Sequence, residues 1–435
     1  MLIEFTVGNY RSFKEPVTLS MVATKARARN KQRDEDNVFA ADEDLNLLKS
    51  AAIYGANASG KSNLIRAIGF MRAFVVASSI ATQAGDLLDV EGFRLSMETI
   101  HEPTHFEIVF LNQGTQYRYG FEVNREQVMA EWLYHIPSTR EAKLFLREGN
   151  SFTLSNAFRE GRDVIDKTRD NALFLSVVAQ FNGPIAQIVL RWFRELRVVS
   201  GLDDTVSRKF TESSLEGDNH REAIVNLVKK LDLGIDGLSL EEDEFVYQLL
   251  MDTARSIGER ATMAPERVRE LKASVRSVVR THHKVFDAEG QPVSQEVFDI
   301  DQHESEGTQK LFALAGPLID TLKNGRVLVI DEFDARLHPM ITCEIIHLFH
   351  SREINPHNAQ LIFTTHDTNL LSNEIFRRDQ IWFTEKDRQG ATHLYSLVEY
   401  KVRNDASFEK NYIEGRYGAV PFIGDLRRLF GEADG

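Results

Sequence analysis

Hydrophobic and polar residues alternate along much of the N-terminal third of the chain, which predicts antiparallel β-strands. The stretch Met1–Val22 alternates on both sides of a Gly-Asn turn and indicates a β-hairpin. Thr104–Phe110 and Tyr117–Val123 alternate around another Asn/Gly turn and indicate a second hairpin. Gly92–Leu95 is a short candidate strand, and Ala130–Phe152 is expected to add further antiparallel strands. We therefore expect a β-rich subdomain here.

Other segments carry apolar residues without interruption or at helical spacing. Leu47–Tyr54 indicates a strand, and Asn63–Met71 follows it with helical spacing. A further helix is expected over Leu173–Leu196, with a short strand at its end. Val327–Ile330 and Leu361–Phe363 are continuous apolar runs, which parallel strands tolerate when both of their faces are covered. The chain is therefore predicted to have an α/β core.

Residues 201–290 form the least regular part of the chain. This part contains three amphipathic helix candidates: Arg221–Leu231, Glu244–Ile257 and Pro265–Val275. No heptad repeat is sustained, so we expect a compact helical insertion and no long coiled-coil arm. Two strands, Val275–Phe286 and Gln295–Ile300, are expected to return the chain to the core.

The strongest chemical signal follows the predicted strand Leu47–Tyr54. Eight residues match G-x-x-x-x-G-K-[ST], the loop that cradles the phosphates of nucleoside triphosphates: Gly55, Ala56, Asn57, Ala58, Ser59, Gly60, Lys61 and Ser62. Glycines permit the turns that aim backbone N–H groups at an anion. Lys61 supplies an ammonium group for the β- and γ-phosphates, and the Ser62 hydroxyl can join the coordination shell of Mg²⁺. The flanking strand and helix are the setting that this loop requires.

Polar residues also follow the two continuous apolar runs. Asp331 and Glu332 end the first run, where Asp331 can hold Mg²⁺ through water and Glu332 suits a general base for the attacking water. His366 ends the second run, where an imidazole can sense the γ-phosphate. Because open α/β sheets bind ligands at the carboxyl ends of their strands, these residues are expected beside the phosphate loop.

A second candidate anion site precedes the predicted helix Leu311–Leu322. Ser305 and Gly307 lie just before this helix, and such residues form caps that bind anions. One nucleotide needs only one phosphate loop, so this cap is expected to reach the γ-phosphate held by a second subunit. The segment Asp334–Pro339 lies just past Glu332, where a turn can communicate between two nucleotide sites.

Composition narrows the classes of function. The 435 residues are 42% hydrophobic and 27% charged, as in an ordinary globular protein. A net charge of −13 disfavours indiscriminate binding of polyanions, although it leaves room for a local basic groove. We interpret the basic run Lys25–Arg33 as a solvated loop in preference to a nucleic-acid contact. A single cysteine, Cys343, fits a reducing compartment. No stretch approaches the ~20 uninterrupted apolar residues of a membrane span, so we expect a cytoplasmic protein without a membrane partner.

Together these elements resemble the ATP-binding-cassette (ABC) ATPases of the SMC/RecF type. The likeness is closest to the stand-alone ATPases related to overcoming-lysogenization-defect (OLD) proteins, found in bacterial antiphage and abortive-infection systems. It is carried by the phosphate loop and by Asn9–Phe13, Ser305–Gln309, Val329–Glu332, Leu337–Pro339, Thr364–Asp367 and Gly415–Pro421. The signature Ser-Glu-Gly-Thr-Gln differs from the Leu-Ser-Gly-Gly-Gln of transporters, which argues against a transporter.

The resemblance implies an ABC-type P-loop NTPase head with an N-terminal antiparallel β subdomain and a compact helical insertion. It also implies a homodimer, or a higher even-numbered oligomer, that sandwiches two ATP molecules with Mg²⁺. One subunit would contribute Lys61, Ser62, Asp331, Glu332 and His366. The other subunit would contribute Ser305 and Gly307.

Three further residues are given candidate roles beside this set by the same resemblance. Arg11 and Phe13 would lie near the base or ribose of the nucleotide. Gln83 is a candidate for the glutamine loop by position only. The predicted domains are an ATPase lobe I with the phosphate loop and β-rich subdomain (1–200), a helical insertion (201–290), and an ATPase lobe II with the signature, the Asp-Glu strand and the switch histidine (291–435).

The functional interpretation depends partly on which other motifs the sequence carries. OLD nucleases contain a C-terminal metal-dependent nuclease (Toprim) domain, whereas about seventy residues follow His366, fewer than a domain of ~100 residues needs. The histidines show no H-E-x-x-H spacing and have no cysteine partners. We therefore expect an ATPase that senses infection and controls a separate effector, expected to be a nuclease.

Two alternatives stay open. One is a RecF-like DNA-binding ATPase in DNA repair or maintenance, which would bind duplexes in a salt-sensitive manner. The other is a nucleotide-gated scaffold in which hydrolysis is vestigial, although Glu332 speaks against it.

Overall fold

The computed structural model describes residues 1–25, 31–137, 140–217, 220–231, 234–242, 277–402 and 406–421. The chain divides into two compact units. Unit 1 comprises Met1–Leu202, Thr321–Ala335 and Thr342–Gly435, and unit 2 comprises Asp203–Asp320 and Arg336–Ile341. Helices α10 (Glu306–Asn324) and α11 (Pro339–His350) run from one unit into the other.

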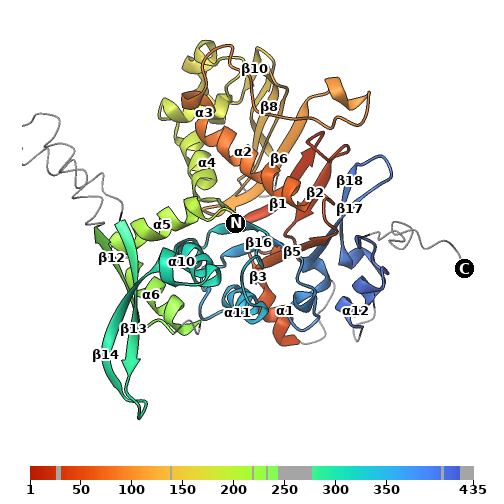
Figure 1. Ribbon diagram of the computed structural model, residues 1–435. Coiled ribbons are helices and arrows are strands. Elements are labelled where there is room, and N and C mark those ends of the chain that lie inside the picture. Colours follow the sequence, from red (N-terminus) through yellow and green to blue (C-terminus); the bar gives the residue numbers. More distant parts are fainter. Residues whose placement is uncertain are drawn as a thin grey trace, which may run out of the picture. The chain divides into compact units, whose positions relative to one another are not determined.

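A six-stranded sheet is the frame of unit 1 (Figure 1). In spatial order its strands are β11 (Arg197–Ser200), β15 (Val327–Asp331), β16 (Gln360–Thr364), β5 (Ser50–Gly55), β17 (Ile381–Lys386) and β18 (Thr392–Ser396). The first five strands are parallel and β18 is antiparallel. Phe363 of β16 is in register with Ile330 of β15 and with Ala52 of β5, so the three strands end at one edge.

A seven-stranded antiparallel sheet is the second large sheet of unit 1 (Figure 1). In spatial order its strands are β10 (Ser151–Leu154), β9 (Ala142–Glu148), β8 (Val128–Ile136), β7 (Thr115–Val123), β6 (Thr104–Asn112), β1 (Leu2–Gly8) and β2 (Val17–Ser20). The antiparallel β subdomain predicted from the alternating pattern is therefore present.

The helices of unit 1 are α1 (Lys31–Asn37), α2 (Lys61–Ala81), α3 (Phe174–Gln180), α4 (Pro184–Glu195) and α12 (Phe408–Ile413). Helices α2, α3 and α4 supply residues to the main hydrophobic core of unit 1. Short 3₁₀ helices cover Thr99–His101, Asn156–Lys167, Thr368–Leu370, Arg378–Gln380 and Leu397–Glu399, and β3 (Val38–Ala40) pairs with β4 (Asn46–Leu48). Among the described residues, α2 is the helix long and apolar enough to cross a membrane, but it supplies residues such as Leu64, Ile68 and Met71 to the core.

Unit 2 combines helices with a small sheet. Its elements are α5 (Thr205–Glu216), α6 (Arg221–Lys230), β12 (Gly237–Glu242), β13 (Ser277–Phe286), β14 (Pro292–Asp299), α9 (Ile300–His303) and the first part of α10. The three strands form an antiparallel sheet in the order β12-β13-β14. Leu215, Ile224, Val279 and Phe312 belong to its hydrophobic core.

Several local predictions differ from the structure. The strand expected over Leu47–Tyr54 is split between β4 and β5, and Gly92–Leu95 forms no strand. The helix expected over Leu173–Leu196 is broken into α3 and α4, because Asn182 has a φ of 66° and Pro184 starts a new helix.

The predicted helical insertion also differs in part. Helices α5 and α6 are present, whereas the candidates Glu244–Ile257 and Pro265–Val275 lie outside the described residues. Strands β13 and β14, which were expected to return the chain to the core, pair with β12 inside unit 2. Unit 2 also extends to Asp320, beyond the boundary that was placed at residue 290.

Candidate nucleotide site

The phosphate loop has the backbone that its sequence requires. It links the end of β5 at Gly55 to the start of α2 at Lys61, and the backbone φ angles of Ala58 and Gly60 are 61° and 116°. A Cβ atom on Gly60 would lie 2.4 Å from the Thr392 hydroxyl, and one on Gly55 would lie 2.5 Å from the Thr384 carbonyl oxygen. Both positions therefore need glycine for conformation and for space.

A cavity of about 660 Å³ opens over this loop within unit 1. Its lining consists of residues of the loop and of the start of α2, one residue of β17, and residues that follow β15 and β16: Asn57, Ala58, Ser59, Gly60, Lys61, Ser62, Asn63, Arg66, Glu332, His366 and Lys386. The structure thus brings the loop, Glu332 and His366 to one place, at the carboxyl ends of parallel strands. Its size is that of a small-molecule ligand site.

Lys61 is buried and held against the loop. Its Nζ donates hydrogen bonds to the carbonyl oxygens of Gly55, at 2.8 Å, and of Ala56, at 3.1 Å. Burial lowers the pKa of Lys61 to about 8, although the carboxylates of Asp331 and Glu332 act in the opposite direction. A phosphate group in the cavity would give this ammonium a negative partner and raise its pKa again.

Asp331 and Glu332 are held in place by one threonine. The Thr364 hydroxyl donates to Asp331 Oδ1 at 2.6 Å and accepts the Glu332 backbone N–H at 2.7 Å. Glu332 has a φ of 49°, a left-handed conformation that a non-glycine residue adopts only under local constraint. Gly201 packs so closely that an added Cβ would lie 2.1 Å from the Glu332 carbonyl oxygen. Thr364 and Gly201 therefore position the two carboxylates.

His366 follows β16 and lines the same cavity. Its backbone N–H lies 3.3 Å and 3.4 Å from the two carboxylate oxygens of Asp334. Loss of solvent around the ring and the nearby Lys61 ammonium lower the pKa of His366, while Asp334 and Glu332 oppose this shift. The neutral imidazole is therefore favoured, which suits a hydrogen-bonding role more than a charged one.

Ser12 and Thr392 support the loop from behind. The Ser12 hydroxyl accepts the Asn63 amide at 2.8 Å and bonds to the Thr392 hydroxyl at 2.9 Å. Thr392 also donates to the Ser59 carbonyl oxygen at 2.8 Å. Ser12 lies in the Asn9–Phe13 segment that the resemblance singled out, but neither it nor Thr392 was predicted as a site residue, because no spacing rule links them to the loop.

The predicted positions of Phe13 and Arg11 near the base or ribose stay predictions. Phe13 has an exposed fraction of 0% and packs within the hydrophobic core. Its ring is apolar and gains more free energy from burial than from a solvated contact. Arg11, with a φ of 49° and an ion pair to Glu91 at 3.8 Å, stays a prediction.

Gln83 does not fit the glutamine loop. Helix α2 begins at Lys61 and ends at Ala81, and 21 residues at a rise of about 1.5 Å each span roughly 30 Å. Gln83 follows the far end of this helix, where its backbone N–H bonds to Asp86. The position in the sequence was misleading because α2 carries the chain away from the phosphate loop before it reaches Gln83.

The signature segment belongs to unit 2. The Ser305 hydroxyl accepts the Thr308 backbone N–H at 3.1 Å and so caps the start of α10. Gly307 lies against the loop after Glu332, since an added Cβ would be 2.8 Å from the Arg336 carbonyl oxygen. Arg336 forms ion pairs with Glu306 at 3.4 Å and with Asp204 at 3.6 Å.

The residues suited to a divalent cation are Ser62 and Asp331. A hydroxyl and a carboxylate are the hard oxygen ligands that Mg²⁺ prefers, and the Asp331 oxygen not bonded to Thr364 is available for this purpose. Among the described residues, no group of three or more His, Cys, Asp or Glu side chains is arranged to hold a metal by itself. Two of the histidines are hydrogen-bonded to side chains that are not part of a metal site: His283 to Glu304, and His350 to Ser50.

Residues 50–372 match the family model described as AAA domain, putative AbiEii toxin, Type IV TA system. A search of curated proteins finds no match. Three solved structures with similarity are SMC heads. The head bound to the C-winged helix domain of ScpA has 14% identity and a TM-score of 0.45, with 91% of this chain and 97% of that chain covered.

The other two structures match over similar shares of each chain. The SMC head domain from Thermotoga maritima has 14% identity and a TM-score of 0.42, with 91% of this chain and 98% of that chain covered. The Smc head domain with an extended coiled coil bound to the C-terminal domain of ScpA, derived from Pyrococcus furiosus, has 13% identity and a TM-score of 0.39, with 96% and 98% covered.

Proposed function

Because the chain belongs to the family of AAA domains described as putative AbiEii toxins of type IV toxin–antitoxin systems, we propose that it is a cytoplasmic ATP-hydrolysing subunit of an antiphage defence system. In this proposal it dimerises around ATP and controls a separate effector, expected to be a nuclease. The main support for ATPase activity is that the phosphate loop, Glu332 and His366 line the same cavity.

The chemistry follows from the residues of this cavity. The loop N–H groups and Lys61 bind the triphosphate, and Mg²⁺ held by Ser62 and Asp331 would neutralise charge that develops on the phosphates. Thr364 fixes the backbone of Glu332 beside Asp331, and in this position the Glu332 carboxylate accepts a proton from the attacking water. His366, with its lowered pKa, accepts or donates a hydrogen bond near the γ-phosphate as a neutral ring.

Dimerisation is supported by the signature segment. Ser305 and Glu306 are exposed at the start of α10, and the cap formed by Ser305 leaves N–H groups of the first turn for an anion. In the proposal, this helix start binds the γ-phosphate held by the other copy. The dimer would then close when ATP binds and open after hydrolysis.

The defence role is supported by the family description, which names a toxin system. We therefore expect the closed dimer to hold or release the separate effector. Co-purification with the product of the neighbouring gene would identify it, and degradation of nucleic acid by the pure chain, abolished by changes in its own residues, would overturn this part of the proposal.

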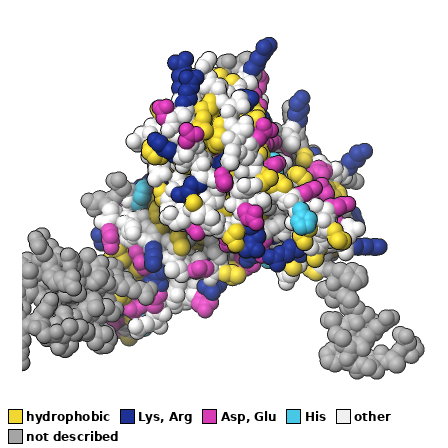
Figure 2. All heavy atoms as spheres, turned by 90° about the horizontal axis from the view of Figure 1, so that it is seen from above, with side chains coloured by type: hydrophobic (Ala, Val, Ile, Leu, Met, Phe, Trp, Pro, Cys, Tyr) yellow, Lys and Arg dark blue, Asp and Glu magenta, His cyan; other side chains and the backbone are white. Residues whose placement is uncertain are grey.

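The alternative is a RecF-like DNA-binding ATPase. The net charge of −13 does not favour it, and on the face shown in Figure 2 basic and acidic side chains are interspersed. That alternative requires duplex binding that depends on ATP and weakens steeply as salt rises. Absence of duplex binding at about 50 mM salt would remove it.

A size measurement tests the dimer directly. In light scattering with Mg-ATP, Glu332→Gln should run as a dimer, and the double variant Glu332→Gln/Ser305→Glu should stay monomeric because a carboxylate at the helix start repels the γ-phosphate. Ser213→Glu, which changes an exposed serine on α5, is the matched control and should leave the dimer intact. A dimer that survives Ser305→Glu would contradict the sandwich.

A further inference from the structure

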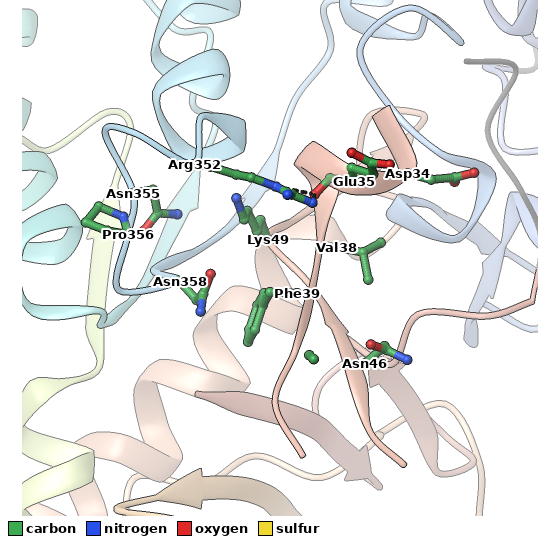
Figure 3. Close-up of a pocket in the computed structure, with 11 residues that line it drawn as sticks. Asp34, Glu35, Val38, Phe39, Asn46, Lys49, Arg352, Asn355, Pro356 and Asn358 are labelled. Atoms are coloured by element: carbon green, nitrogen blue, oxygen red, sulfur yellow. Dashed lines mark hydrogen bonds between the residues drawn. The ribbon is translucent and has the colours of Figure 1, made fainter. Parts of the chain in front are cut away.

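A second cavity, of about 610 Å³, lies in unit 1 at the opposite ends of the same strands. Lys49 lies directly before β5, and Asn358 lies two residues before β16 (Figure 3). The remaining lining residues come from α1, β3, β4 and the loop after α11: Asp34, Glu35, Val38, Phe39, Ala40, Asn46, Arg352, Asn355 and Pro356. The cavity is close in size to the nucleotide cavity of the same chain.

Two cations lie side by side in this cavity. Lys49 is 1% exposed, and its Nζ donates to the His350 carbonyl oxygen at 3.1 Å. Arg352 extends across to α1, where Nε and a terminal nitrogen donate to the Glu35 carbonyl oxygen at 3.1 Å and 2.7 Å (Figure 3). Within the described part of the chain, neither side chain forms an ion pair with a carboxylate. Both charges therefore rest on neutral oxygens.

The acidic residues that line the cavity are engaged elsewhere. Asp34 pairs with Arg377, and Glu35 pairs with Lys31 at 3.8 Å. Arg377 compensates the Asp34 charge, whereas the exposed pair of Lys31 with Glu35 compensates the Glu35 charge only weakly. Burial lowers the pKa of Lys49 to about 8 and the neighbouring Arg352 adds to this shift, whereas the Asp36 carboxylate acts in the opposite direction.

We propose that this cavity binds a small phosphate-bearing ligand of mononucleotide size, at a site separate from the phosphate loop. The Lys49 ammonium has two donors left after its bond to His350, and the Arg352 guanidinium is suited to phosphate oxygens. Phe39, Val38 and Pro356 offer apolar surface for the body of the ligand, and the amides of Asn46 and Asn358 offer polar contacts.

The experiment uses the full-length Lys61→Ala variant, in which the phosphate loop has lost its lysine. Thermal melting is followed as AMP or inorganic phosphate is added. AMP should raise the melting temperature in a saturable manner, and inorganic phosphate should act at least tenfold more weakly because it has no body to contact Phe39. A failure of the ATPase proposal would leave this result unchanged, since the loop lysine is already absent.

Variants of the two cations decide whether the cavity is responsible. Arg352→Glu, at an exposed position, should weaken AMP binding by about tenfold or more, and Lys49→Met should do the same. Arg159→Ala removes an exposed arginine elsewhere and should have no effect. The proposal is overturned if AMP gives no saturable shift, if inorganic phosphate acts as strongly as AMP, or if Arg352→Glu retains the shift.

Discussion

The two ends of strand β5 present buried lysines in different settings. Lys61 follows the carboxyl end of β5, and Lys49 precedes its amino end. Both side chains donate hydrogen bonds to backbone carbonyl oxygens, and burial lowers the pKa of each to about 8. Lys61 lies near the carboxylates of Asp331 and Glu332, whereas Lys49 lies beside the cation Arg352. Carboxylates beside the lysine at the carboxyl end suit metal-assisted hydrolysis, whereas two neighbouring cations at the amino end suit the binding of an anion.

The largest expected effect on nucleotide binding distinguishes the two ends of β5. Lys61→Ala should weaken ATP binding by about 100-fold, because it removes a charged donor to the phosphates, while AMP should still bind at the second cavity. Isothermal titration with each nucleotide measures both affinities. Lys209→Ala, at an exposed position in unit 2, is the control and should leave ATP affinity unchanged. Equal loss of ATP and AMP binding in Lys61→Ala would show that the ends are not independent.

A smaller effect is expected from the packing behind the carboxylates. Gly201→Ala places a Cβ within 2.2 Å of the carbonyl oxygens of Asp331 and Glu332, so the strand end must shift. A displacement near 1 Å costs up to about 100-fold in rate, and we expect turnover to fall by about 10- to 100-fold with less change in ATP affinity. Steady-state kinetics provide the readout. Gly217→Ala, whose nearest neighbour is 4.0 Å away, should behave like the wild type.

The smallest effect is the pH dependence of binding. The pKa of Lys61 is about 8 in the free protein, and bound phosphate should raise it. Binding therefore takes up a proton above pH 8, so ATP affinity should be fully present below pH 8 and fall as pH rises above it. Titrations between pH 7 and pH 9.5, in roughly half-unit steps, would show this trend. Affinity that rises over this range would contradict the assignment of Lys61.

Much of the nucleotide site could be predicted from the sequence because its chemistry uses fixed spacing. The loop Gly55–Ser62 and the pair Asp331-Glu332 each lie within a few residues of a strand end, so local pattern was sufficient to identify them. Thr364, Ser12 and Thr392 act through contacts between residues 33 to 380 positions apart, and no local pattern reports such contacts.

The fold was predictable to a similar degree. Alternating patterns gave the antiparallel sheet, and continuous apolar runs gave β15 and β16. The pairing of β13 with β12 was missed because residues 243–276 separate the two strands in the sequence. The second cavity was missed for the same reason, since Lys49 and Arg352 are about 300 residues apart and belong to no motif.

The most direct test of the account is the rate of phosphate release from Mg-ATP by the wild type and by Glu332→Gln, with ATP binding measured in parallel. The glutamine keeps the shape of the side chain but cannot accept the proton of the attacking water. We predict that ATP affinity is retained and that turnover falls by about 10²- to 10⁴-fold. Unchanged turnover in Glu332→Gln would mean that hydrolysis does not take place at this site through Glu332.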